Sequence, residues 1–175
     1  MRPALWAAAC VSAMAISSAC APHAPVPPPG PSPAEMVAAA DALDQRFREA
    51  FNKQDVDALM ATYWNSPDLV SFGPDGLGLK GWDANKAGSA EMFKAMPGAT
   101  LEFTATHNNA QGDVVLGWGT WKLTIPAQPA PQVLEGRYTD VKALRDGKWV
   151  YLVDHASVPL PPPPAPAPAP AAAKK

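Results

Sequence analysis

The chain has 175 residues, with 16 acidic and 14 basic side chains and a formal net charge of −2. This mild negative balance, with no basic patch interleaved with aromatic residues, argues against nucleic acid as a partner. Two cysteines are too few for a disulfide framework, and one of them, Cys10, lies in a segment that we expect to be removed.

The first twenty residues have the pattern of a secretory leader. Arg2 precedes an uncharged stretch, residues 3–16, that is too short to span a bilayer, and small residues then lead to Cys20. The segment resembles a bacterial lipoprotein signal, in which Cys20 is lipidated and becomes the first mature residue. The alternative is an ordinary cleaved leader, because Ser17 and Ala19 also suit a general signal peptidase. We therefore expect export to the periplasmic face of the bacterial envelope, with a membrane anchor on Cys20.

Proline and alanine dominate two segments that flank a central domain. After a signal peptide of residues 1–19, residues 20–32 form a linker, and residues 159–175 form a tail. Both favour extended polyproline II and are expected to act as disordered spacers. Residues 33–158 are enough for one domain with a substantial core, and they contain no cysteine.

The first half of this domain has helical periodicity. Ser32 and Glu35 predict a capping box for a helix that begins at Pro33, and its apolar stripe is Val37, Ala40, Leu43, Phe47 and Phe51. Asp55 begins a second helix, with the buried stripe Val56, Leu59, Met60 and Tyr63. A short strand at residues 68–72, a glycine turn at 73–76, a returning strand at 77–79 and a third helix at about 82–94 follow.

From residue 99 onward the apolar pattern alternates. Four strands are predicted, at residues 100–108, 114–125, 133–144 and 149–158, and Asp146-Gly147 predicts a tight hairpin before the last of them. Helices followed by an antiparallel meander indicate an α+β domain with its helices on one face of the sheet.

Several motifs, in this order, carry a resemblance to a known superfamily: Asp55-Val56-Asp57-Ala58-Leu59, Tyr63-Trp64, Asp68-Leu69-Val70, Gly136-Arg137-Tyr138-Thr139 and Asp154-His155-Ala156-Ser157. The chain resembles the nuclear transport factor 2-like superfamily, and within it the SnoaL-like and ketosteroid-isomerase-like branch, which has many members of unknown function. The resemblance implies a cone, in which a strongly curved antiparallel or mixed sheet wraps around N-terminal helices and leaves a hydrophobic pocket. It also implies a homodimer through the outer sheet face.

The position that corresponds to the catalytic base of ketosteroid isomerases holds residues that cannot accept a proton. In those enzymes a carboxylate at the end of the early strand moves the substrate proton, and the matching position falls near Phe72 and Gly73. Asp75 follows, but Pro-Asp-Gly is more simply a turn in which the aspartate caps its own backbone. This argues against the isomerase mechanism here.

Two histidines are the candidate catalytic bases. Strict alternation puts His107 on the apolar face shared with Phe103, and it puts His155 on the face of Tyr151, with Asp154 pointing the opposite way. The alternative for each histidine is a structural role, in which a neighbouring polar group or carbonyl satisfies the ring.

Further side chains could bind or orient a ligand, namely Tyr63, Trp82, Arg137 and Asp154. Arg137 would alternatively be a solvated or dimer-face residue. Trp118 and Trp121 lie on opposite faces of one strand, so that one points outward, which favours a second subunit over the outer face. We expect no metal, because a third well-placed ligand is missing, and no other cofactor.

Two classes of function remain open. The first is an exported, membrane-anchored domain that binds a small apolar molecule or serves as an accessory to an envelope complex. The alternative is a SnoaL-like or isomerase-like enzyme, in which His155 or His107 moves a proton in an isomerisation or hydrolysis of a small hydrophobic substrate. We favour the first over an enzyme, because a carboxylate at the Phe72 position and a metal-ligand set are both missing.

Overall fold

The computed structural model describes residues 30–159. The predicted signal peptide, the lipid-anchor site Cys20 and the tail from residue 160 onward lie outside the described residues. The helices are α1 (Pro33–Asn52), α2 (Val56–Met60) and α3 (Trp82–Ala95), and the strands are β1 (Val70–Phe72), β2 (Gly78–Lys80), β3 (Thr100–Gln111), β4 (Val114–Ile125), β5 (Gln132–Arg145) and β6 (Lys148–Ser157). None of these helices is long and apolar enough to cross a bilayer.

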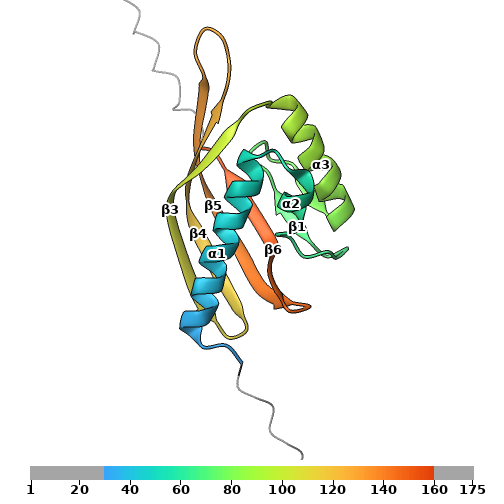
Figure 1. The fold of residues 1–175 in the computed structure, drawn as a ribbon, viewed down its shortest axis with the longest axis vertical. Helices are drawn as coiled ribbons and strands as arrows, with labels where there is room; N and C mark the ends of the chain where they lie inside the picture. Colours follow the sequence, from blue (N-terminus) through green and yellow to red (C-terminus); the bar gives the residue numbers. More distant parts are fainter. Residues whose placement is uncertain (1–29, 160–175) are drawn as a thin grey trace, which may run out of the picture. The chain divides into compact units, whose positions relative to one another are not determined.

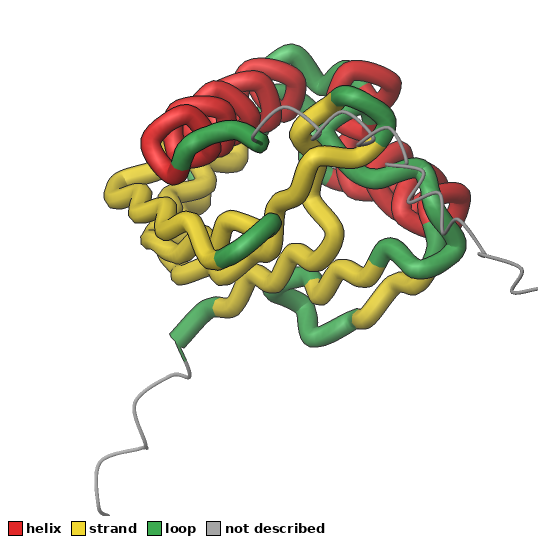
Figure 2. Tube along the Cα trace, turned by 90° about the horizontal axis from the view of Figure 1, so that it is seen from below, coloured by secondary structure: helices red, strands yellow, loops and turns green. Residues whose placement is uncertain are grey.

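One six-stranded sheet forms the body of the described region, in the order β2-β1-β6-β5-β4-β3. Strands β3 to β6 form the predicted antiparallel meander, and β1 joins its edge parallel to β6 (Figure 1). The helices lie on one side of this sheet, which is curved and does not close into a barrel (Figure 2). The predicted α+β class with N-terminal helices and a curved mixed sheet is confirmed.

Local sequence signals account for the helix boundaries. The capping box of α1 is present, since the Ser32 hydroxyl accepts from the Glu35 N–H and the Glu35 carboxylate accepts from the Ser32 N–H. Asp55 caps α2 through the N–H of Ala58 at 2.9 Å. α2 ends at Met60, however, so Tyr63 is not part of its stripe and instead pairs with β6 as an isolated bridge.

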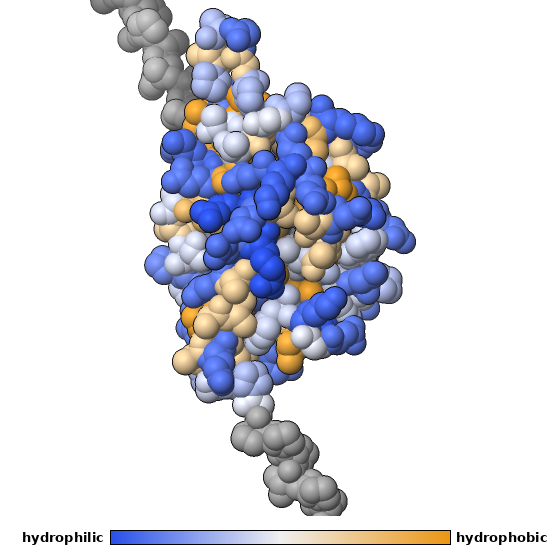
Figure 3. All heavy atoms as spheres, viewed as in Figure 1, coloured by the Kyte–Doolittle hydropathy of each residue, from blue (hydrophilic) through white to orange (hydrophobic). Residues whose placement is uncertain are grey.

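An aromatic cluster lies between α1 and the sheet. Phe47 makes edge contacts with Tyr63 and Tyr151 at centroid distances of 6.0 and 5.6 Å, and it stacks on Phe103 at 6.1 Å. We call the sheet face under α1 the inner face. The opposite side of α1 carries mostly hydrophilic side chains (Figure 3).

The outer face is partly apolar. It holds a shallow depression of about 370 Å³ between β4, β5 and β6, lined by Leu116, Trp118, Val141 and Val153 among others. Trp118 is 43% exposed there, whereas Trp121 is 5% exposed on the inner face, so the two tryptophans point in opposite directions as predicted.

The homodimer that this pattern favours stays a prediction. Light scattering of the protein truncated to residues 32–158 should give a dimer mass, because apolar side chains of this size are commonly covered by a partner. A monomer mass at high micromolar concentration would contradict it.

Candidate functional site

Both candidate histidines lie on the outer face, so the face predicted for each is wrong. His107 is exposed and stacks on Trp118 at a centroid distance of 5.5 Å, and His155 is exposed with its ring edge-on to Phe72 at 6.0 Å. Phe72 itself is 46% exposed.

Two β-bulges cause the reversal. The register of β3 against β4 shifts between Phe103 and Ala105, which leaves Thr104 as an extra residue. The register of β6 against β5 shifts in the same way, because Tyr151 pairs with Lys142 and Val153 pairs with Val141, which leaves Leu152 as the extra residue. One extra residue exchanges the two faces for every residue that follows it, and alternation read from sequence alone does not contain it.

The residues next to the histidines point inward instead. Asn108 reaches α1, where its amide donates to Asp41 at 2.8 Å and to Asp44 at 2.9 Å. Asp154 accepts a hydrogen bond of 2.7 Å from the Tyr63 hydroxyl. The structure therefore brings together two of the predicted pocket residues, Tyr63 and Asp154.

The other predicted residues lie elsewhere. Arg137 is exposed on the outer face. Trp82 is half-buried at the start of α3, and its indole N–H donates to the carbonyl of Met60 at 3.1 Å. Asp75 accepts from the N–H of Leu77 at 3.0 Å, which is the turn role weighed for it.

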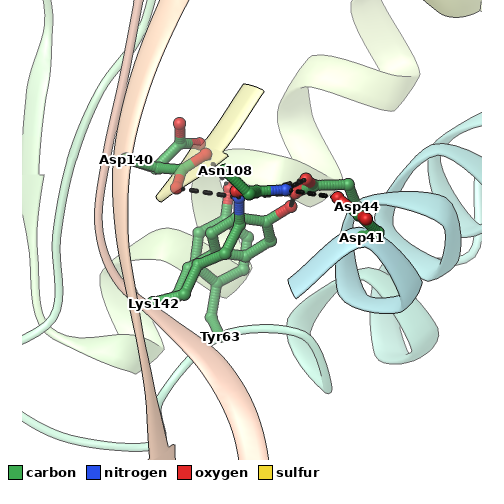
Figure 4. Close-up of polar contacts among 8 residues, drawn as sticks. Asp41, Asp44, Tyr63, Asn108, Asp140 and Lys142 are labelled. Carbon is green, nitrogen blue, oxygen red and sulfur yellow. Dashed lines mark hydrogen bonds and ion pairs between the residues drawn. The ribbon is translucent and has the colours of Figure 1, made fainter. Parts of the chain in front are cut away.

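A lysine that the sequence did not single out is the centre of the inner face. Lys142 is 0% exposed, and its ammonium lies 2.9 Å from Asp44 Oδ1 and 3.0 Å from Asp140 Oδ1 (Figure 4). It also donates to Asn108 Oδ1 at 2.7 Å. The Tyr151 hydroxyl donates to the same Asp44 carboxylate. We call Asp44, Asn108, Asp140, Lys142 and Tyr151 the inner network.

A glycine makes room for this network. Gly117 lies opposite Asp140 in the β4–β5 pairing. A side chain at Gly117 would collide with the Asp140 carboxylate and with the Lys142 ammonium. The absence of a side chain at Gly117 therefore leaves space on the inner face for the charged groups of Asp140 and Lys142.

Negative charge exceeds positive charge in this region, because Asp44, Asp140 and Asp154 face one lysine. Burial, opposed by the Lys142 ammonium, raises the pKa of Asp140 from 3.8 to about 7. Burial also raises the pKa of Asp154, against the lowering effect of the Tyr63 hydrogen bond. Asp140 is thus able to take up and release a proton near neutral pH.

Two buried oxygens in the described region lack a partner in good hydrogen-bond geometry, the Tyr138 hydroxyl and Asp140 Oδ1. Thr106 lies beside the hydroxyl, and the Lys142 ammonium lies 3.0 Å from Asp140 Oδ1. The two residues are two positions apart on β5, are 6% and 5% exposed, and face inward together. Buried polar atoms normally have well-aligned partners, so these two oxygens keep capacity for a further hydrogen bond.

The sequence carried a signal for the missed residues. Asp44 falls within the apolar stripe of the first helix, four positions after Ala40 and three before Phe47. Asp140 and Lys142 alternate in line with Tyr138 on one strand face. Opposite charges at apolar positions of two elements indicate a buried pair between them.

The sequence from residue 45 to residue 152 matches the profile of the SnoaL-like domain. The chain belongs to the SnoaL-like domain family. This agrees with the predicted membership of the nuclear transport factor 2-like superfamily. The sequence matches no curated protein.

Solved structures resemble this SnoaL-like domain over most of their length. A candidate calcium/calmodulin-dependent protein kinase type II association domain from Thiobacillus denitrificans is 28% identical, with 69% of this chain and 94% of that chain covered and a TM-score of 0.61. A candidate dehydratase of the nuclear transport factor 2-like family from Streptomyces avermitilis is 18% identical, with 74% and 100% covered and a TM-score of 0.68. A nuclear transport factor 2-like protein from Salmonella enterica is 18% identical, with 77% and 98% covered and a TM-score of 0.67. The last two show the fold of this SnoaL-like domain alone.

Proposed function

We propose that this SnoaL-like domain binds a small, largely apolar molecule against the inner face of its sheet. The observation that carries the proposal is the pair of buried oxygens of Tyr138 and Asp140, neither of which has a partner in good hydrogen-bond geometry. Asp140 accepts a hydrogen bond when ionised, and a tyrosine hydroxyl can donate or accept one. A ligand hydroxyl or carbonyl group fits this pair, and the rings of Phe47, Phe103 and Tyr63 offer an apolar surface for the ligand body.

Replacing Tyr138 by phenylalanine tests the binding. Because the hydroxyl has no well-aligned partner, we expect its removal to change the free energy of unfolding by no more than about 1 kcal/mol. We expect it to lower the fraction of protein that retains a co-purified small molecule in native mass spectrometry. Asp140→Asn should also lower retention, whereas Asp113→Asn, in the exposed β3–β4 turn, should not. Full retention by Tyr138→Phe, or a wild-type protein that carries no small molecule, would contradict the proposal.

An acid–base enzyme is the second candidate, and the pKa of Asp140 near 7 favours it. A carboxylate with such a pKa can accept a proton from a bound substrate at neutral pH. The role of base, sought among the histidines, then falls to Asp140, with Tyr138 donating to the developing oxyanion. If the wild-type protein converts the co-purified molecule and Asp140→Asn does not, the result favours an enzyme over a binding domain.

We also propose that the chain is exported and held at the envelope by a lipid on Cys20. The support is the leader pattern of residues 1–19 and the small residues before Cys20. Cys20→Ala should leave a folded protein that no longer fractionates with membranes. Cys10→Ala, inside the leader, is the matched control and should remain membrane-bound. A Cys20→Ala protein that stays with salt-washed membranes would remove the anchor.

A further inference from the structure

A second depression lies away from the inner network, between the end of α2, the start of α3 and the β5–β6 hairpin. We call it the Trp64–Trp82 cleft. Its volume is about 290 Å³, at the small end of ligand sites in proteins. Its lining includes Tyr63, Trp64, Trp82, Arg145, Asp146 and Lys148.

The two tryptophan walls are held in place by hydrogen bonds. The backbone N–H of Trp64 donates to the carbonyl of Tyr151 at 3.0 Å, which ties it to the edge of β6. Trp82 is fixed twice, because its backbone N–H donates to Ser66 at 3.0 Å and its indole N–H donates to Met60 at 3.1 Å. The cleft is therefore formed before any ligand arrives, which lowers the entropic cost of binding.

Positive charge exceeds negative charge along the cleft. Arg145 and Lys148 line it, against the single carboxylate of Asp146. Among the described residues, neither cation has a carboxylate oxygen within 4.0 Å. Both cations are thus available to an anion from outside the chain.

Arg145 lies over the Trp64 indole. Its guanidinium lies 5.7 Å from the centroid of the Trp64 ring, and one of its N–H groups donates to the Leu144 carbonyl at 2.9 Å. The remaining N–H groups form a planar fork, the geometry that binds a carboxylate through two parallel hydrogen bonds. The guanidinium covers one face of the Trp64 indole, so an apolar ring would pack against the remaining surface of that indole.

We propose that the Trp64–Trp82 cleft binds a small aromatic carboxylate, with the carboxylate on Arg145 and Lys148 and the ring against the two indoles. No residue of the inner network lines this cleft, and the proposal does not rest on the function proposed above. It nevertheless touches Tyr63, whose hydroxyl holds Asp154 on the inner face. A ligand here would contact the residue that positions one of the inner carboxylates.

The test uses 2-naphthoate as the probe and 2-naphthamide as its uncharged counterpart, titrated into the protein while the tryptophan indole N–H signals are followed by NMR. We expect 2-naphthoate to shift the signals of Trp64 and Trp82 and to bind at least tenfold more tightly than the amide. Arg145→Gln should weaken 2-naphthoate binding about tenfold and leave binding of the amide unchanged. Arg46→Gln, an exposed arginine on α1, is the matched control and should change neither.

Three results would overturn the assignment. They are equal affinity for the acid and the amide, unchanged 2-naphthoate affinity in Arg145→Gln, and shifts confined to Trp118, which lines the outer-face depression instead. Since Arg145 is at the end of β5, a melting curve of Arg145→Gln that matches the wild type confirms that the variant is folded. If Arg145→Gln does not fold, Lys148→Gln takes its place, and 2-naphthoate affinity equal to the wild type overturns the assignment.

Discussion

Replacing Lys142 by methionine should lower the free energy of unfolding by about 3 to 5 kcal/mol at pH 8, the range measured when one partner of a buried ion pair is removed. Methionine is one atom shorter than lysine but similar in volume, so little packing is lost. The loss comes from Asp44 and Asp140, which lie 2.9 and 3.0 Å from the ammonium and would be left as buried carboxylates without a counter-charge. Urea unfolding followed by circular dichroism measures the change.

The matched control is Lys80→Met. Lys80 pairs with Asp68 at 3.7 Å, but both side chains are 71% exposed, so its removal should cost less than about 1 kcal/mol. Lowering the pH to 5 should reduce the Lys142→Met defect, because Asp140 is then protonated and no longer needs the ammonium. A defect that is equally large at both pH values would show that lost packing, and not unpaired charge, is its cause.

The stability of the wild-type domain should fall as the pH rises from about 4 to about 8. The pKa of Asp140 is raised from 3.8 to about 7, so across this window the folded state holds a proton that the unfolded state has released. Folding is then linked to proton uptake, and the free energy of unfolding decreases with pH by at most about 4 kcal/mol before it levels off above the folded pKa. The raised pKa of Asp154 acts in the same direction.

Asp140→Asn isolates this contribution. The amide cannot ionise, and Lys142 keeps Asp44 as its partner, so the variant should show a flatter pH profile from urea unfolding at pH 4.5 to 8. Asp113→Asn, in an exposed turn, should follow the wild-type profile. If the profiles of Asp140→Asn and the wild type run parallel, Asp140 does not titrate in this window.

Secondary structure was largely predictable because its signals are local. A capping box, a three-to-four-residue apolar repeat and an Asp-Gly turn each depend on a few neighbouring residues, and the helix from Pro33 and the hairpin at Asp146 are confirmed. The early end of α2 was missed, because Tyr63 leaves the helix to pair with β6, a contact that no local pattern contains.

The candidate site was predicted in part. Tyr63 and Asp154 were both chosen and do lie together, although Asp154 was expected to face the other way. The bulges at Thr104 and Leu152 explain why the predicted faces are wrong. A bulge depends on how two strands pair, so the alternation of apolar residues along one strand does not reveal it. Lys142 was missed because its partner Asp44 lies on a helix far away in the sequence.

The inner network also bears on the order in which the domain assembles. Asp44 bonds to Lys142 across 98 positions and to Tyr151 across 107 positions, so α1 leaves the ribosome long before either partner is made. Contacts between residues this distant close the longest loops in a chain and slow its folding. The Asp44 carboxylate must remain in water until β5 and β6 are in place, so the network closes late and its closure marks the completed fold. A nascent chain stalled before residue 142 should therefore be far more sensitive to proteolysis across α1 than the finished protein.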